Sequence, residues 1–357
     1  MTIALQGVVK QVGSETHIHE TELTLETGLT VLLGPTNAGK TSLMRLMAGL
    51  DRPTRGKVIV DGEDVTGMPV QKRQIAMVYQ QFINYPAMTV YDNIASPMRV
   101  AGADKATIDQ EVRRAADLLK LGPFLERTPL NLSGGQQQRT AIARAIVKKA
   151  KLVLLDEPLA NLDYKLREEL RAELPKIFAE SGAIFVYATT EPSEALLLGG
   201  HTATLAEGRV TQFGPTVQVF RKPVDLITAQ TFSDPPMNEI RARKTGSSFE
   251  LEGGTQVPAP AAIEDGAYTL GFRPHHLSLE AEGDASVALN AHVTVTEITG
   301  SESFVHLDHG GRDWVMLTQG IHDIEPDRTL EVHLDTRHLL VFDDAGRNVS
   351  HGERLAA

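Results

Sequence analysis

One stretch of the chain combines glycines, a lysine and a hydroxyl at a spacing that suits phosphate binding. Residues 34–41 read Gly-Pro-Thr-Asn-Ala-Gly-Lys-Thr and match the pattern G-x-x-x-x-G-K-S/T at every fixed position. Glycines let the backbone turn tightly, so that consecutive N–H groups face phosphate oxygens, and the next helix adds partial positive charge at its N-terminus. In such a loop Lys40 can neutralise β- and γ-phosphates and the Thr41 hydroxyl can hold Mg²⁺.

The predicted phosphate-binding set is wider than these two side chains. Asn37 is expected to accept a left-handed backbone more readily than most residues. The alternative is a chance glycine-rich turn, which a preceding strand and a following helix argue against. The set is Gly34, Pro35, Thr36, Asn37, Ala38, Gly39, Lys40, Thr41 and Ser42.

Two carboxylates follow an apolar strand further along the chain. Asp156 and Glu157 come directly after the run Leu-Val-Leu-Leu at 152–155. Because parallel strands end at one edge of a sheet, we expect Asp156 beside the phosphate loop, where it would contact Mg²⁺. Glu157 could orient or deprotonate a water that attacks the γ-phosphate. A buried strand that ends in a solvated acidic turn is the alternative interpretation.

A second helix N-terminus is marked by Leu-Ser-Gly-Gly-Gln-Gln-Gln-Arg at 132–139. Ser133 and Gln136 have the spacing of a capping box, which by itself indicates no more than a well-capped helix. Gly134 and Gly135 would also expose backbone N–H groups at that helix end, which makes it a candidate second anion site.

Alternating strands and helices surround these motifs and predict an α/β fold up to about residue 230. The segment 30–33 is an apolar strand that leads into the phosphate loop, and Leu43, Leu46, Met47 and Leu50 follow at helical spacing. Further strands are predicted at 3–10, 22–26, 57–60, 75–79, 152–155 and 183–188, and further helices at 104–121 and at 163–180, the latter kinked or interrupted at Pro175.

The pattern changes after residues 233–236, which read Ser-Asp-Pro-Pro. Short alternating segments separated by Gly, Asp and Pro follow, as in a small all-β sandwich or barrel. We therefore predict one domain over residues 1–235 and a second over 236–357. The segments in question are 268–272, 287–295, 304–307, 314–317, 330–334 and 339–342.

The phosphate loop, the 132–139 segment and Leu-Asp-Glu-Pro at 155–158, in this order, resemble ABC-transporter ATPase subunits, and the resemblance covers the whole chain. It implies a P-loop ABC ATPase domain with a helical subdomain at about 85–150. It also implies a Q-loop at 78–80, whose Gln80 serves Mg²⁺ and the attacking water, and a D-loop at 159–163.

The C-terminal half resembles the accessory OB-like β-barrel domain of sugar-type importers, through residues 235–238, 271–277 and 300–302. That group takes up carbohydrates, polyols and glycerol phosphate. The resemblance implies that two ATPase subunits close head to tail, with each ATP between one phosphate loop and the signature helix at 133–136 of the other. It further implies two integral-membrane permease subunits, contacted through a groove around residues 80–88, and an external solute-binding protein.

Three residues depart from the family pattern. Thr190 stands where the family usually has a histidine; its hydroxyl can hydrogen-bond a γ-phosphate but cannot titrate near pH 7. Val12 stands where the family usually stacks an aromatic residue on adenine, and it offers apolar contact without a π face. Ala160 is a milder change in the D-loop.

These departures leave three hypotheses. Tolerated drift in an active ATPase is one. We favour an asymmetric pair, in which this subunit's own site is slow while its signature helix completes an active site on a non-identical ATPase, as in a glycerol or polyol importer with two distinct ATPases. Two departures at one pocket, with Lys40, Asp156 and Glu157 retained, support this choice. The third is a nucleotide-binding regulatory module with little hydrolysis of its own, which the retained Glu157 argues against.

Composition excludes other classes of protein. The chain has 357 residues, no cysteine and 35 basic against 46 acidic residues, for a net charge of −11. Disulfides, thiolate metal sites and cysteine nucleophiles are therefore excluded. The negative charge argues against nucleic-acid partners and hence against an ABC-type ATPase that acts on DNA or ribosomes. No apolar run approaches the roughly 20 residues of a membrane span, and residues 1–7 lack a signal-peptide pattern, so we expect a peripheral protein on the cytoplasmic face of the cell membrane.

Two histidines give a weak indication of a metal site. His17 and His19 lie two apart on a predicted strand and could share a face that binds a metal ion. No third ligand is close in the sequence, so we interpret them as part of a solvated strand face.

Overall fold

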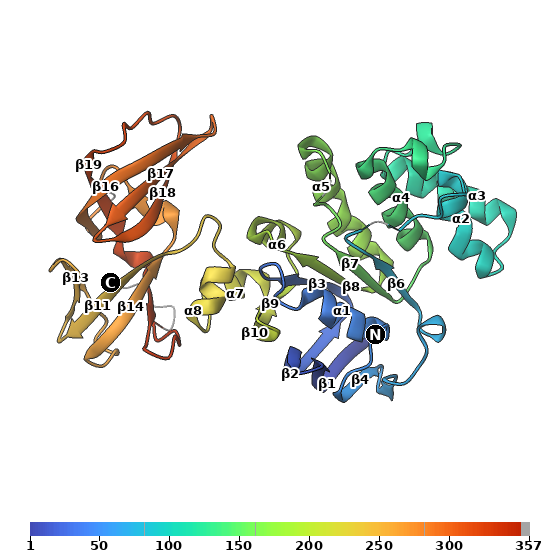
Figure 1. Ribbon diagram of the computed structural model, residues 1–357, viewed down its shortest axis with the longest axis horizontal. Helices are drawn as coiled ribbons and strands as arrows, with labels where there is room; N and C mark the ends of the chain where they lie inside the picture. Colours follow the sequence, from blue (N-terminus) through green and yellow to red (C-terminus); the bar gives the residue numbers. More distant parts are fainter. Residues whose placement is uncertain (82, 161, 282, 351–357) are drawn as a thin grey trace. The chain divides into compact units, whose positions relative to one another are not determined.

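The computed structural model describes residues 1–350 apart from positions 82, 161 and 282 (Figure 1). Contacts within the chain divide it into two units, Met1–Val217 and Gln218–Ala357. The division falls inside helix α7 (Thr216–Arg221), earlier than residue 235. The physical reason is local: Phe220 packs edge-on against Phe232, and the Arg273 guanidinium donates a 2.7 Å hydrogen bond to the Phe220 carbonyl, so this segment is bonded to the β domain.

The first unit is built on a six-stranded sheet with the order β10-β9-β3-β8-β7-β6. Strands β9, β3, β8, β7 and β6 are mutually parallel, and β10 joins the edge antiparallel. Strands β7 and β8 are buried along their whole length, which explains their unbroken apolar sequences. The bounds are β3 (Gly28–Leu33), β6 (Ile75–Val78), β7 (Leu152–Asp156), β8 (Ile184–Thr189), β9 (His201–Ala206) and β10 (Arg209–Pro215).

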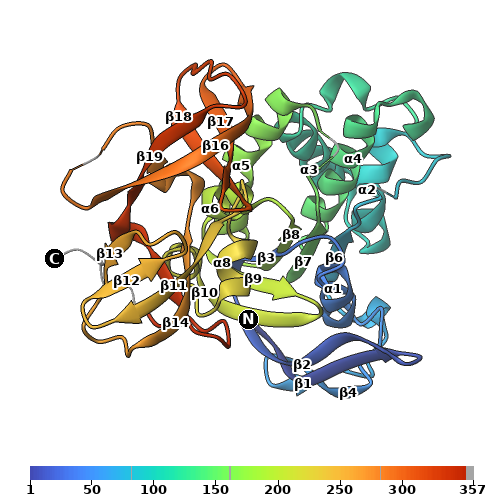
Figure 2. The same cartoon turned by 60° about the vertical axis from the view of Figure 1, so that its left-hand side comes forward.

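A second, antiparallel sheet has the order β2-β1-β4-β5 and lies on the other side of helix α1 (Figures 1 and 2). Leu43, Leu46 and Met47 of α1 are fully buried between the two sheets, as their spacing predicts. Leu50 is outside the helix, because Gly49 ends it in a left-handed conformation. The bounds are β1 (Thr2–Val12), β2 (Glu15–Glu26), β4 (Arg55–Val60), β5 (Glu63–Asp64) and α1 (Lys40–Ala48).

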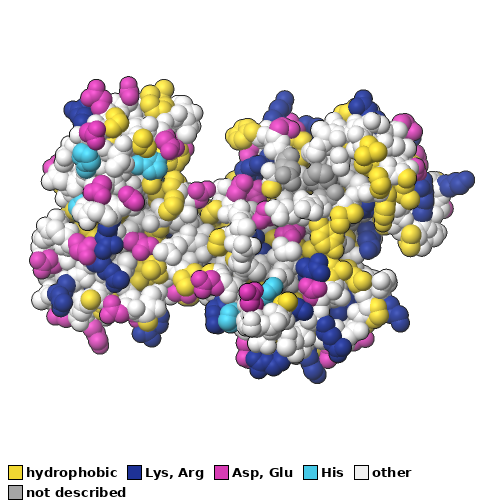
Figure 3. Space-filling model, viewed as in Figure 1, with side chains coloured by type: hydrophobic (Ala, Val, Ile, Leu, Met, Phe, Trp, Pro, Cys, Tyr) yellow, Lys and Arg dark blue, Asp and Glu magenta, His cyan; other side chains and the backbone are white. Residues whose placement is uncertain are grey.

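Three helices form a helical layer beside the sheet's β6 edge: α2 (Val90–Val100), α3 (Lys105–Leu118) and α4 (Gly134–Val147) (Figure 1). Ile108, Val112 and Ala115 are buried along α3, as their spacing predicts. Helices α5 (Tyr164–Ser181) and α6 (Pro192–Leu198) pack on the sheet, and α5 continues past Pro175. On the face seen in Figure 3, hydrophobic side chains gather over the helical layer.

The second unit contains two five-stranded antiparallel sheets with the orders β13-β12-β11-β14-β20 and β15-β19-β16-β17-β18. The Phe272 ring meets Trp314 edge-on at 5.1 Å in the core between them. All six predicted strands are present. The bounds are α8 (Leu226–Thr231), β11 (Asn238–Thr245), β12 (Ser248–Leu251), β13 (Gln256–Pro258), β14 (Gly266–Phe272), β15 (Leu277–Ser278), β16 (Ser286–Ile298), β17 (Glu302–His309), β18 (Arg312–Gln319), β19 (Thr329–Asp335) and β20 (Leu340–Phe342).

Within the described residues, none of the helices has the length and apolar character needed to cross a membrane.

Candidate functional site

The phosphate loop connects the end of β3 to the start of α1, and two of its glycines are sterically required. A Cβ at Gly34 would lie 2.3 Å from the Leu205 carbonyl oxygen. Gly39 has φ 102°, a conformation that side chains disfavour. Asn37 has φ 67°, in the left-handed region that the sequence predicts for it. The backbone therefore makes the tight turn that a phosphate-binding loop needs.

Lys40 folds back over this loop. Its ammonium donates hydrogen bonds to the carbonyl oxygens of Gly34 (2.7 Å) and Pro35 (3.0 Å), and the side chain is 5% exposed. It also lies 3.7 Å from a Glu157 carboxylate oxygen. Burial lowers the pKa of the Lys40 ammonium, and the attraction of Glu157 and Asp156 opposes part of that shift. A positive charge thus lies where the phosphate groups are expected.

Asp156 lies at the end of β7, next to the start of α1. The Thr41 hydroxyl donates a 2.8 Å hydrogen bond to the Asp156 carboxylate. Burial raises the pKa of this carboxyl, while Thr41 and Lys40 pull the pKa back toward its usual range. A hydroxyl, a carboxylate and the amide oxygen of Gln80 are hard oxygen donors, so this set fits Mg²⁺.

The Glu157 carboxylate contacts the side chains of Gln80 and Lys40. The Gln80 amide donates a 2.9 Å hydrogen bond to Glu157 Oε2, and the Lys40 ammonium approaches Glu157 Oε1. The Glu157 backbone has φ 46° and its N–H donates to the Ala188 carbonyl at 3.0 Å, so β7 and β8 together fix the carboxylate's position. A carboxylate held this way can orient or deprotonate a water molecule.

A cavity of about 870 Å³ opens over the loop. Among the predicted residues, Thr36, Asn37, Ala38, Gly39, Lys40, Thr41, Ser42, Gln80 and Glu157 line it. Gly34 and Pro35 contact Lys40 and Asp156 contacts Thr41, so these three lie behind that surface. The residues that sequence reasoning missed are Glu15, Thr16, His17, His19, Glu207 and Gly208. The pair His17 and His19 was visible in the sequence but was interpreted as a solvated strand face.

Two predicted residues lie apart from this cavity surface. Val12 is 51% exposed at the β1–β2 hairpin and is not among the lining side chains. Thr190 is exposed after β8 and is also outside the lining. The preceding residue, Thr189, is buried and donates a 2.7 Å hydrogen bond to the buried Glu194. The bond from Thr189 to Glu194 therefore anchors the segment, and the Thr190 side chain remains exposed.

The signature segment lies at the N-terminus of α4, away from the cavity lining. Ser133 and Gln136 form the predicted capping box, with the Ser133 N–H donating to the Gln136 side chain at 3.0 Å. Gly134 and Gly135 follow in the first turn of the helix. Within one chain, the two candidate anion-binding ends thus do not share this cavity. Asn161, in the predicted D-loop, is outside the described residues.

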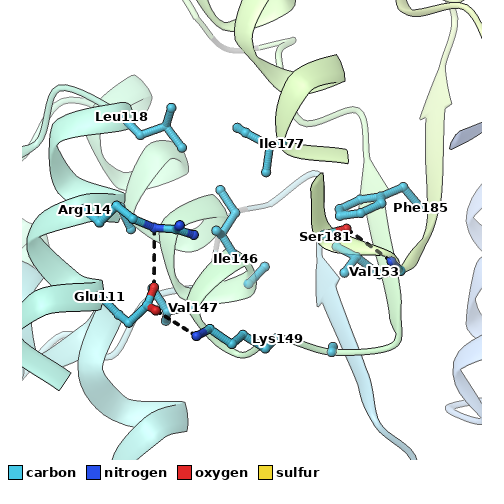
Figure 4. A pocket seen from close by; sticks show the side chains of 14 residues that line it. Glu111, Arg114, Leu118, Ile146, Val147, Lys149, Val153, Ile177, Ser181 and Phe185 are labelled. Carbon is cyan, nitrogen blue, oxygen red and sulfur yellow. Dashed lines mark hydrogen bonds and ion pairs between the residues drawn. The ribbon is translucent and has the colours of Figure 1, made fainter. Parts of the chain in front are cut away.

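A second cavity, of about 640 Å³, lies between α3, α4, β7 and α5 (Figure 4). Apolar side chains such as Leu118, Ile146 and Phe185 line most of it. Its charged groups pair with one another: Lys149 donates to Glu111 at 2.7 Å, and Arg114 lies 3.5 Å from the same carboxylate. The two cations are thus already neutralised, so this cavity is a poorer phosphate site than the one over the loop.

A third cavity, of about 410 Å³, lies where the helical layer meets β6. Tyr85 and Met88 line it, from the predicted groove at 80–88, together with Val100, which is 90% exposed. The Arg144 guanidinium lies over the Tyr85 ring at 5.0 Å. Phe82 is outside the described residues. Exposed apolar side chains together with two cations, Arg144 and Lys148, suit a protein partner.

Comparisons with known proteins agree on the family. A family model described as ABC transporter matches residues 18–160, and a TOBE domain model matches residues 270–342. The chain is 35% identical over 357 residues to the sn-glycerol-3-phosphate import ATP-binding protein UgpC of Burkholderia mallei. The matched region covers 96% of this chain and 98% of that protein. It is 36% identical to UgpC of Salmonella typhimurium, over 97% and 99% of the two chains.

A solved structure supports the fold of the first unit. It is described as the dimeric structure of a post-hydrolysis state of the ATP-binding cassette MJ0796 bound to ADP and Pi. The similarity has a TM-score of 0.56 and 27% sequence identity, and it covers 60% of this chain and 98% of that one.

Proposed function

The chain belongs to the family of ABC transporter ATP-binding proteins, and from that premise we propose that it is the ATP-hydrolysing subunit of an importer for glycerol phosphate, a polyol or a small sugar. The names of the relatives support glycerol phosphate as the substrate class. The substrate does not touch this chain in the proposal; it crosses through two separate permease subunits after delivery by an external solute-binding protein.

One observation supports the catalytic part of this proposal above the others. Lys40, Gln80 and Glu157 come from α1, the segment after β6 and the end of β7, and they meet over one loop. When ATP enters, the Lys40 ammonium exchanges the carbonyls of Gly34 and Pro35 for the β- and γ-phosphates. Glu157 then loses its cation and faces the attacking water, which Gln80 helps to orient.

The metal site that we propose lies beside these residues and shares Gln80 with them. Thr41, Asp156 and Gln80 would hold Mg²⁺, which neutralises charge on the phosphate oxygens. Burial raises the pKa of the Asp156 carboxyl, and a cation beside it would favour the ionised form.

A second ATPase subunit completes the site in this proposal. The N-terminus of α4, with Ser133, Gly134 and Gly135, lies outside the chain's own cavity and is free to meet a nucleotide bound to a partner. ATP can drive closure because it would contact both subunits and so bind the closed state more tightly than the open one.

We further propose that the partner is a non-identical ATPase. The hydroxyl of Thr190, which is exposed and outside the cavity lining, supports a slow site in this chain because it cannot titrate near pH 7. The intact capping box at Ser133 supports a working contribution to the partner's site. The permease subunits would dock at the groove formed by Tyr85, Met88 and Val100, which sets the chain on the cytoplasmic face of the membrane.

The experiment that tests the function is ATP turnover by the native complex, isolated through a tag on this chain. We expect permease subunits and a second ATPase to copurify, and turnover to fall with Lys40→Ala. A complex that contains no membrane subunit would contradict the transport role. If Glu157→Gln left turnover intact, the regulatory alternative would replace hydrolysis at this chain's own site.

A further inference from the structure

The cavity over the phosphate loop is lined by side chains of opposite charge. Lys40 carries the positive charge that suits a triphosphate. Glu15 and Glu207 line the same cavity, and their carboxylates repel phosphate groups. A nucleotide that places its phosphates at Lys40 must therefore direct its uncharged base toward Glu15 and Glu207.

Backbone contacts join the turn that carries Glu207 and the start of β2 to the phosphate loop. The Gly208 N–H donates a 3.0 Å hydrogen bond to the Ala38 carbonyl, and the His19 N–H donates a 2.8 Å bond to the Gly208 carbonyl. A Cβ at Gly208 would lie 2.4 Å from the His17 carbonyl oxygen, so the turn packs directly against β2. These contacts of Gly208 hold the start of β2 beside the phosphate loop.

Two imidazoles point from that strand into the cavity. His17 and His19 are two residues apart and therefore share one face of β2, opposite the buried Ile18. Among the described residues that line the cavity, their rings are the only aromatic ones. Val12, at the position where the family usually places an aromatic residue, does not line it.

His17 is the better placed of the two to meet a base. Its side chain is 41% exposed, and its Nε2 lies 3.7 Å from a carboxylate oxygen of Glu15, which also lines the cavity. His19 is less exposed and follows on toward the interior of the sheet. His17 thus combines a contact with Glu15 and a partly exposed ring in the lining of the cavity, where a ligand can reach it.

We propose that His17 stacks on the adenine ring of ATP and replaces the base contact that Val12 cannot supply. This proposal rests on the proposed function, since it needs ATP in the cavity. A ring that stacks on a base contributes affinity without touching the phosphates. The Glu15 and Glu207 carboxylates also accept hydrogen bonds from an exocyclic amine, which adenine has at the position where guanine has a carbonyl.

The test compares two ligands on the full-length chain by isothermal titration: ATP, and inorganic tripolyphosphate, which has no base. We expect His17→Ala to weaken ATP binding about tenfold, or ~1.4 kcal/mol, and to leave tripolyphosphate binding unchanged. His17→Phe keeps an aromatic face and should bind ATP as the wild type does. His201→Ala is the matched control, since it removes an exposed imidazole at the opposite end of β9 from Glu207.

Each other outcome overturns the proposal. ATP binding within twofold of wild type in His17→Ala would show that the base does not rest on this ring. Equal losses for ATP and tripolyphosphate would show damage to the loop instead of loss of a base contact. Failure of His17→Phe to restore ATP binding would exclude stacking. If the wild-type chain bound neither ligand, the proposed function itself would fail.

Discussion

The Thr41 hydroxyl at the start of α1 donates a 2.8 Å hydrogen bond to Asp156 at the end of β7, although the two residues are 115 positions apart. The bond joins the phosphate loop to the strand that supplies both acidic side chains of the site. It also brings together two hard oxygen donors of the kind that Mg²⁺ requires. Loop and strand end therefore act as one unit.

Removing the Thr41 hydroxyl should reduce the effect of Mg²⁺ on the affinity for ATP. In Thr41→Val the side chain keeps its shape but loses the oxygen. The gain in ATP affinity on adding Mg²⁺ should be smaller than in the wild type by a factor of about ten or more. ATP affinity without the metal should change little. Titrations with and without Mg²⁺ measure this difference. An unaltered Mg²⁺ effect would contradict the assignment of Thr41 to the metal.

Replacing the second carboxylate should separate binding from hydrolysis. Glu157→Gln keeps an acceptor for the Gln80 amide but cannot take a proton from water. We expect turnover at this chain's site to fall by about 10²–10⁴-fold, while ATP still binds. Single-turnover assays of the native complex, in which the partner's site carries the equivalent change, isolate this site. Turnover near the wild-type rate would refute the role of Glu157.

The sequence predicts this part of the site well because its information is local. A glycine loop between a strand and a helix allows few geometries, and parallel strands must end at one edge, so Lys40 and Asp156 could be placed in advance. The place of His17 in the cavity lining could not be predicted, because it depends on the contact of Gly208 with Ala38, two segments that no local pattern relates.

The fold also contains elements that local sequence predicts and others that depend on distant contacts. Strand β11 was not predicted, because the inward positions of its alternating pattern include polar residues instead of an apolar run. Asn238 and Lys244 are both buried there. Tertiary partners make this possible: the Lys244 ammonium donates to the Gly246 carbonyl and to Asp265, and the Asn238 amide donates to the Val315 carbonyl. Such partners cannot be read from spacing alone.

The core of the β domain offers a stability test with a built-in probe. Trp314 is the chain's single tryptophan and is 1% exposed, in edge contact with Phe272. Phe272→Ala leaves a cavity beside that indole, and we expect it to destabilise the β domain by about 3–5 kcal/mol. Denaturant unfolding followed by Trp314 fluorescence measures the loss. The exposed Phe213→Ala, in β10, serves as a control that should leave this transition unchanged.

Asp156 should reduce the stability of the Mg²⁺-free protein at neutral pH. Burial raises the pKa of its carboxyl, so the folded chain binds a proton there that the unfolded chain has already released. Stability therefore falls as pH rises from the ordinary aspartate pKa through the raised one. Asp156→Asn cannot titrate, so we expect a higher melting temperature than wild type at pH 7 and no difference below the ordinary aspartate pKa. A variant less stable than the wild type at pH 7 would contradict this.

The asymmetric-pair hypothesis depends on Thr190, whose side chain is exposed after β8. The buried bond from Thr189 to Glu194 fixes the backbone on either side, so a histidine can replace Thr190 without disturbing the core. In Thr190→His an imidazole stands where the family usually has a histidine, and it could carry charge near pH 7. We expect turnover at this chain's own site to rise several-fold in the native complex, with its pH dependence centred near the imidazole pKa of about 6.5.

The matched control is Thr190→Asn, which adds a hydrogen-bonding side chain of similar length without a titrating group. It should leave both the rate and the pH profile as in the wild type. Unchanged turnover in Thr190→His would mean that the hydroxyl already suffices, and drift in a symmetric, active ATPase would then be the better account. An equal rise in both variants would assign the gain to hydrogen bonding and not to charge, because only the imidazole can titrate in this range.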